Sequence, residues 1–206
     1  MQYVVEGILF GLTLTILLGP IFIVLVQSSL EKGARAGIIA GTGIWTSDII
    51  IVVACLLFLK RLSPYVQSKG FVFWVGLVGG FVLIATGMVI MMKKPKLEFD
   101  SKKFSASNVL DYWVRGFLVN TINPFTFVFW ISVISSFIVT RGLNNTEASI
   151  FLGSIIATIV VTDSLKVVLA KLIRNRINEK ILGRINKIAG TALIIFGFVL
   201  LLRSVI

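Results

Sequence analysis

The chain has 206 residues, of which 57% are hydrophobic and 14% are charged, and its mean hydropathy of +1.00 is too high for a water-soluble domain. We therefore expect an integral membrane protein. The net charge is +11 and there is no histidine, which excludes zinc sites of the His-Glu-x-x-His type, histidine-based triads and imidazole proton relays. Because neither a phosphate-binding loop nor a dinucleotide fingerprint is present, we expect no ATP-driven step and no cofactor.

Six apolar runs are long enough to cross a membrane, since a spanning helix needs about 20 mostly apolar residues. These runs cover residues 4–27, 36–59, 70–92, 113–139, 148–170 and 185–205. The first run opens without basic residues and is longer than the apolar core of a signal peptide, so we expect it to be retained. The predicted fold class is an all-α integral membrane protein with six transmembrane helices.

Lysines and arginines in the connections predict how the chain is oriented. Fourteen fall on one side of the membrane, namely Lys32, Arg35, Lys93, Lys94, Lys96, Lys102, Lys103, Arg115, Lys171, Arg174, Arg176, Lys180, Arg184 and Lys187. Five fall on the other side, namely Lys60, Arg61, Lys69, Arg141 and Arg203. Basic residues concentrate in cytoplasmic loops, which predicts that both termini face outside. Most of the positive charge is thereby explained as an orientation signal, which leaves contact of the basic loops with membrane lipid open, and we expect no nucleic acid partner.

The longest polar stretch suggests a division of the chain into two halves. It predicts a first three-helix repeat over 1–94, a cytoplasmic linker over 95–111 and a second three-helix repeat over 112–206. Residues 80–93 align without gaps to 190–203, with five identities that include two glycines.

Further signals recur in the same order in both halves. The first apolar run of each half contains a proline, Pro20 or Pro124, and the second contains an aspartate that follows a threonine within two positions, Asp48 or Asp163. Because each half has an odd number of spans, two such repeats must be inverted across the membrane, as in many secondary transporters.

The prolines predict breaks in the first and fourth spans. Pro124 has no N–H, and its ring clashes with the carbonyl of Asn120, so the helix should kink or end there. Such a break is tolerated in a membrane only where protein or a wet cavity lies beside it. Asn120 and Asn123 bring amide groups to this point, either to cap the broken ends or to bind a substrate. The matching Gly19-Pro20 pair favours a binding site, because paired interruptions mark the sites of transporters.

Two aspartates lie inside predicted spans. Asp48 has no basic residue within ten positions, and an ionised carboxylate there costs at least about 2.5 kcal/mol. It is either satisfied by Thr46, Ser47 or a neighbouring helix, or it binds a proton and an ammonium group in turn. Asp163 has Lys166 three residues later on the same helical face, which predicts an ion pair that is structural, a gate or a second proton site.

Glycines at intervals of four residues predict close helix packing. They are Gly7 and Gly11, Gly33, Gly37 and Gly41, and Gly76 and Gly80. This spacing serves packing within the chain and the interface of a homodimer equally well.

A stretch near the N-terminus, GPIFIVLVQSSLEKGARAGIIAGTGIWTSD, resembles the first signature of the lysine exporter (LysE/RhtB) family of amino-acid efflux proteins. The resemblance covers essentially the whole chain. The residues that stand at the family's spacing are Gly19, Pro20, Gly33, Arg35, Gly37, Gly43, Ser47 and Asp48. They are followed by the Asn123-Pro124 pair of the second half. Three positions depart from the pattern. Leu18 replaces a proline, Ser47 replaces a glycine, and Phe125 replaces a lysine, which removes a charge from the expected site.

The resemblance implies a secondary transporter of a bacterial plasma membrane, without enzymatic activity, that exports amino acids or related small metabolites by alternating access with proton coupling. The substrate-binding residues expected are Gly19, Pro20, Asp48, Asn120, Asn123 and Pro124, and those expected for proton coupling or a gate are Asp48, Asp163 and Lys166. One alternative is a cation exporter that uses Asp48, Asp163 and freed carbonyls as ligands. A membrane enzyme or assembly factor is the other, but no nucleophile and base stand together.

Overall fold

The computed structural model describes residues 1–16, 20–61, 68–92, 109–172 and 179–205, and these residues contain helices and turns but no strand. The elements are α1 (Gln2–Ile16), α2 (Pro20–Lys32), α3 (Ala34–Arg61), α5 (Lys69–Met92), α6 (Val109–Thr121), α7 (Pro124–Val133), the π-helix η2 (Ile134–Val139), α8 (Asn145–Leu172) and α9 (Glu179–Val205). The all-helical class expected from the sequence is confirmed over this part of the chain.

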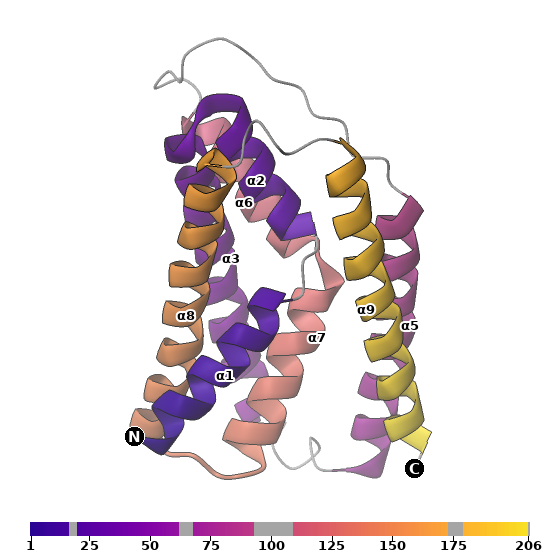
Figure 1. Cartoon of the computed structure of the whole chain (residues 1–206). Coiled ribbons are helices and arrows are strands. Elements are labelled where there is room, and N and C mark those ends of the chain that lie inside the picture. The colour runs from indigo at the N-terminus through magenta and orange to yellow at the C-terminus, as the bar shows by residue number, and fades with distance from the viewer. Residues whose placement is uncertain (17–19, 62–67, 93–108, 173–178, 206) are drawn as a thin grey trace.

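Two of the apolar runs form bent pairs of helices instead of straight spans. α1 and α2 are inclined by 73°, and α6 and the α7–η2 helix by 61°. Figure 1 shows both bends at mid-height, near the centre of the molecule, with both termini at the lower end. Four described helices are long and apolar enough to cross a membrane, and six spans result if each bent pair counts as one. The chain is therefore a multi-pass membrane protein.

Several helices extend beyond the predicted runs at the upper end in Figure 1. α2 continues to Lys32, five residues past the expected end, and α9 begins at Glu179, six residues before the expected start. The added turns carry charged residues, which can lie beyond the apolar layer while the helix continues. The expected linker 95–111 falls outside the described residues except for its last three, which form the first turn of α6.

Local signals explain two of the connections. Gly33 has φ of +87° between α2 and α3, a left-handed conformation that ends a helix and that glycine adopts without strain. At the start of α8 the Asn144 side chain accepts a hydrogen bond from the Glu147 N–H at 2.9 Å, and the Glu147 carboxylate accepts one from the Asn144 N–H at 3.0 Å. This reciprocal capping box fixes where α8 begins.

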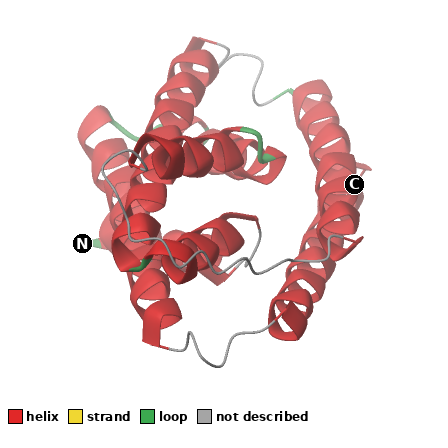
Figure 2. Cartoon of the chain, turned by 90° about the horizontal axis from the view of Figure 1, so that it is seen from above, coloured by secondary structure: helices red, strands yellow, loops and turns green. Residues whose placement is uncertain are grey.

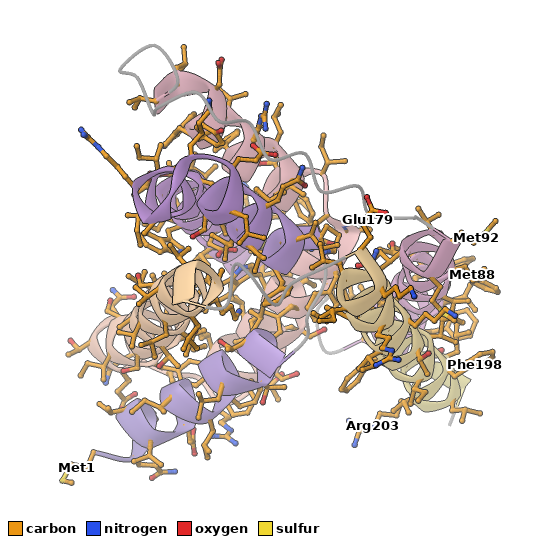
Figure 3. All side chains as sticks on the ribbon, turned by 45° about the horizontal axis from the view of Figure 1, so that its top comes forward. Met1, Met88, Met92, Glu179, Phe198 and Arg203 are labelled. Carbon is orange, nitrogen blue, oxygen red and sulfur yellow. The ribbon has the colours of Figure 1, made fainter. Side chains whose placement is uncertain are left out.

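The main core lies between α3, the α7–η2 helix and α8. Trp130, Ile134, Phe151 and Ile155 have no exposed surface there. Large apolar side chains on the outside remain exposed, and on the α5–α9 pair Figure 3 shows Met88, Met92 and Phe198 pointing away from the rest of the molecule. Apolar surface of this kind suits contact with lipid tails.

Helices α5 and α9 pack closely against each other, and Figure 2 shows them together on one side of the molecule. Their contact uses glycines reciprocally. A Cβ added to Gly80 would lie 2.8 Å from the Gly197 carbonyl oxygen, and one on Gly197 would lie 2.7 Å from that of Gly80. Gly87 and Gly190 form a second pair of the same kind, with 2.5 Å in both directions. Glycine is required here because any side chain would force the backbones apart.

Three further spaced glycines pack against another helix of the chain. Gly7 and Gly11 let α1 approach Ser154 and Thr158 of α8, and Gly37 of α3 lies against Val167 of α8. Helix packing within the chain, one of the two roles expected for glycines at this spacing, is therefore observed. The other role, in the interface of a homodimer, stays a prediction.

Candidate functional site

Asp48 lies in the middle of α3 and is 5% exposed. Its Oδ1 accepts two hydrogen bonds, from the Asn120 side-chain amide at 2.9 Å and from the Trp130 indole N–H at 3.0 Å. Both donors come from the second bent span, one on each side of its break. No described residue bonds to the other carboxylate oxygen, Oδ2, which is therefore available to a proton or to a bound group.

The serine and threonine next to Asp48 do not satisfy it. The Thr46 hydroxyl donates to the Thr42 carbonyl at 2.7 Å, and Ser47 shares a hydrogen bond of 2.8 Å with Thr121. The sequence left open whether Thr46, Ser47 or a neighbouring helix supplies the hydrogen bonds to Asp48. The structure shows that a neighbouring bent span supplies them.

The break at Asn123-Pro124 is satisfied by local groups. The Asn120 carbonyl, which loses its usual partner at Pro124, accepts the N–H of Asn123 at 3.2 Å. Asn123 caps α7, and its side-chain oxygen accepts the Phe125 N–H at 3.2 Å. The Asn120 amide instead bridges two elements, because it donates to Asp48 and accepts from the Thr126 hydroxyl at 2.9 Å. Helix capping thus explains the position of Asn123, whereas the Asn120 side chain is hydrogen-bonded to Asp48.

Asp163 forms the ion pair with Lys166 that the sequence predicts. The Lys166 ammonium lies 2.9 Å from Oδ1, and the Trp45 indole N–H donates to Oδ2 at 3.2 Å. The side chains of Asp163 and Lys166 are 4% and 15% exposed. Both oxygens of Asp163 are therefore bonded within the chain, in contrast to Asp48.

A small central cavity brings the two aspartates and the two helix breaks together. Six of the expected site residues line it, namely Pro20, Asp48, Asn120, Asn123, Asp163 and Lys166. Its volume of 30 Å³ holds about two water molecules, because one water needs roughly 10–15 Å³. Gly19 lies outside the described residues, and Pro124 lines a neighbouring cavity instead. The residues are gathered as a site requires, but the space between them is too small for an amino acid.

The ends of the broken helices determine the electrostatics around this cavity. α2 begins at Pro20 and α7 at Pro124, so each presents its N-terminal end, with the positive end of its dipole, to the break. α1 and α6 end at Ile16 and Thr121 and present carbonyl ends. Such a centre attracts an anionic group to the positive helix ends, and it offers carbonyl oxygens and Asp48 to a cationic one.

Two larger cavities lie beside the central one, between the α5–α9 pair and the bent spans. The upper cavity, of 640 Å³, is lined by parts of α2, α5, α6 and α9 and shares Pro20 and Asn123 with the central cavity. The lower cavity, of 400 Å³, is lined by parts of α1, α5, α7 and α9 and shares Phe125. Both volumes fall in the range of small-molecule sites, about 300–1,000 Å³.

Sequence reasoning missed three residues that hold the site together, namely Trp130, Trp45 and Thr126. One signal was present for Trp130, because a tryptophan far from a span end must find a partner for its N–H. The partners themselves lie 82 and 118 residues away for Trp130 and Trp45, so only the folded chain identifies them.

Comparison with known proteins agrees with this architecture. The profile of the family described as LysE type translocator matches residues 12–204. The helices define a multi-pass membrane protein, and the chain belongs to the LysE type translocator family. A protein of Bacillus subtilis (strain 168) named "Putative amino acid efflux protein YcgF" is 25% identical over 203 residues, which cover 96% of this chain and 94% of that protein. No solved structure matches the chain.

Proposed function

We propose that the protein exports amino acids or related small metabolites from the cytoplasm by proton-coupled alternating access in the plasma membrane. The observation that carries this proposal is the central cavity, where a half-bonded carboxylate meets the broken ends of two spans. Family membership and the name of the Bacillus relative support the direction of transport and the substrate class.

The chemistry of the cavity matches the two charged groups of an amino acid. The free oxygen of Asp48 accepts either a proton or the substrate ammonium, which makes the two compete for one site. The N-terminal ends of α2 and α7 bind the substrate carboxylate. Asp163 and Lys166, which already satisfy each other, act as a gate whose ion pair must open for Lys166 to reach the substrate.

Two inverted three-helix repeats account for the arrangement of the spans. Each half runs as a bent span followed by two straight ones. In these repeats α1 corresponds to α6 and α3 to α8. The packing is reciprocal, because α3 of the first half packs along α6 of the second, and α8 of the second half packs along α1 of the first. The α5–α9 contact has the same property. In the alignment of the two halves Gly80 corresponds to Gly190 and Gly87 to Gly197. In the structure each glycine contacts the counterpart of the other one, because Gly80 lies against Gly197 and Gly87 against Gly190. A two-fold axis between antiparallel repeats produces contacts of this kind.

The upper and lower cavities are the two access routes of this cycle. Substrate enters through the upper cavity, occupies a widened central cavity and leaves through the lower one. The arms of the bent spans are joined by an ion pair at each end, Arg115 with Glu31 at 3.5 Å and Arg141 with Glu6 at 3.0 Å. Exposed pairs of this type contribute at most about 1 kcal/mol, so they can open in turn at little cost.

The proposed orientation gives a first prediction. Described basic residues of the larger group belong to the C-terminal end of α2 and to the N-terminal halves of α6 and α9, and these helix ends lie at the upper end of Figure 1, opposite both termini. The positive-inside rule makes that end cytoplasmic. A tag placed after Ile206 should therefore react with an impermeant reagent in intact cells. Protection of the tag until the cells are permeabilised would reject this topology.

Substrate class is tested by reconstitution. Purified protein in vesicles with an imposed pH gradient should accumulate one or more members of a panel of radiolabelled L-amino acids. The same vesicles should accumulate none of a panel of divalent cations, because Lys166 occupies one oxygen of Asp163 and leaves too few oxygen ligands. Cation accumulation without amino acid transport would replace the proposed function by the cation-export alternative.

A further inference from the structure

The lower cavity continues into a second pocket of 250 Å³ towards the end that carries both termini. The two spaces share Ser132, Ser136, Leu200 and Arg203. Neither is lined by an aspartate or a glutamate, and Arg203 is the one charged residue in either lining. An electropositive chamber thus lies on the route between the central cavity and the outer surface.

Arg203 has no partner within the part of the chain that the structure describes. Arg115, Arg141 and Lys166 each pair with a carboxylate, whereas none pairs with Arg203. Figure 3 shows its side chain on the opposite side of the α5–α9 pair from Met88 and Phe198, and the side chain is exposed. A guanidinium group carries five N–H donors and no acceptor, so an anion is the partner it lacks.

Three serine hydroxyls in the same walls are also left without hydrogen bonds by the described residues. They belong to Ser132, Ser135 and Ser136, at the end of α7 and in the π-helix η2. Many other helical hydroxyls bond back to a carbonyl one turn earlier, as Thr86 does to Val82 at 2.8 Å. Ser136 is exposed and the other two serines are half-buried, so the three hydroxyls are accessible to water or to a ligand in the pocket. π-Helical turns are frequent at functional sites.

We propose that Arg203 and these three serines form an outer subsite for the carboxylate of the exported substrate. The guanidinium binds a carboxylate through two parallel hydrogen bonds, and the hydroxyls donate to its remaining lone pairs. The apolar walls at Phe71 and Leu200 contact the rest of the molecule. The subsite draws the substrate away from the central cavity and rests on the proposed function for its occupant. A lipid phosphate has similar chemistry and is the competing occupant.

The chamber is tested by the rate at which a cysteine at position 136 reacts with charged thiol reagents. In Ser136→Cys protein the anionic reagent 2-sulfonatoethyl methanethiosulfonate should react faster than the cationic 2-trimethylammonioethyl analogue. Adding Arg203→Gln should lower this ratio by about tenfold, the effect of removing one charge at a few ångströms in water. Cys55 is buried and gives the background rate. Ser149→Cys, exposed on α8 at the same end, is the control whose ratio Arg203→Gln should not change.

The occupant is tested by protection of the same cysteine in vesicles of phosphatidylcholine. A panel of L-amino acids should slow the labelling, and their methyl esters, which lack the carboxylate, should not. The inference is overturned if Arg203→Gln leaves the ratio unchanged. It is also overturned if only added phosphatidylglycerol protects, because the occupant is then a lipid. If amino acids protect but no transport is measured, the subsite stands and the proposed export function fails.

Discussion

Asp48→Asn is expected to reduce export driven by a pH gradient to the rate of protein-free vesicles. Asparagine keeps the oxygen that accepts from Asn120 and Trp130, so the three helices that meet there stay in place. It replaces the free oxygen by an amide that cannot take up a proton. Exchange of labelled for unlabelled substrate should persist, because exchange requires binding but no net proton movement. The measurement is the pair of rates, net export and exchange, on one vesicle preparation.

Asp163→Asn is the matched control for this change. It alters the same chemical group in the same cavity, but the carboxylate it removes is bonded to Lys166 and Trp45. Loss of a partly buried ion pair leaves Lys166 without a counter-ion and should destabilise the protein by about 3 kcal/mol. Its thermal unfolding should therefore shift far more than that of Asp48→Asn. Export by Asp48→Asn protein at the parental rate and pH profile would assign Asp48 to a structural role.

Asn123→Ala and Pro124→Ala are expected to lower transport several-fold while the protein remains folded. Alanine at position 123 removes the side-chain cap of α7, at a cost of about 1 kcal/mol. Alanine at position 124 restores an N–H that can bond to the Asn120 carbonyl and continue the helix through the break. Either change alters the helix end that faces the central cavity. The initial rate of substrate uptake into vesicles measures the effect.

Asn144→Ala provides the control for lost capping. Asn144 caps α8 with a similar bond, 2.9 Å long, but lies in an exposed turn far along the chain from both breaks. Its loss should cost about the same stability, near 1 kcal/mol, without a change in transport. If the Asn123→Ala and Pro124→Ala proteins transport at the parental rate, the role of the break is structural.

Much of the fold follows from the sequence because the membrane imposes simple rules. Length and hydropathy predict each of the six apolar runs, and the prolines predict that the first and fourth are interrupted. The lack of backbone partners in hydrocarbon then requires polar groups at each break. Asn123 is such a group, and its capping role could be predicted from its place before Pro124.

Lys166 could be predicted as the partner of Asp163, but the partners that the aspartates find on other helices could not. Asp48 is bonded by residues of a span 72 and 82 positions away, and only the packing of α3 against α6 and α7 brings them together. The π-helix at Ile134–Val139 has no sequence signal that we recognise. The lower cavity was likewise missed, because it depends on how far the α5–α9 pair stands from the bent spans.

The most direct test of proton-coupled export is to record luminal pH while substrate leaves. Vesicles loaded with a transported amino acid and with a pH-sensitive dye start without a pH gradient. We predict that substrate efflux acidifies the lumen, since each departing molecule releases Asp48 to carry protons inward, and that Asp48→Asn vesicles show no such change. Efflux at the parental rate without a change in luminal pH, or the same acidification in Asp48→Asn vesicles, would contradict the account.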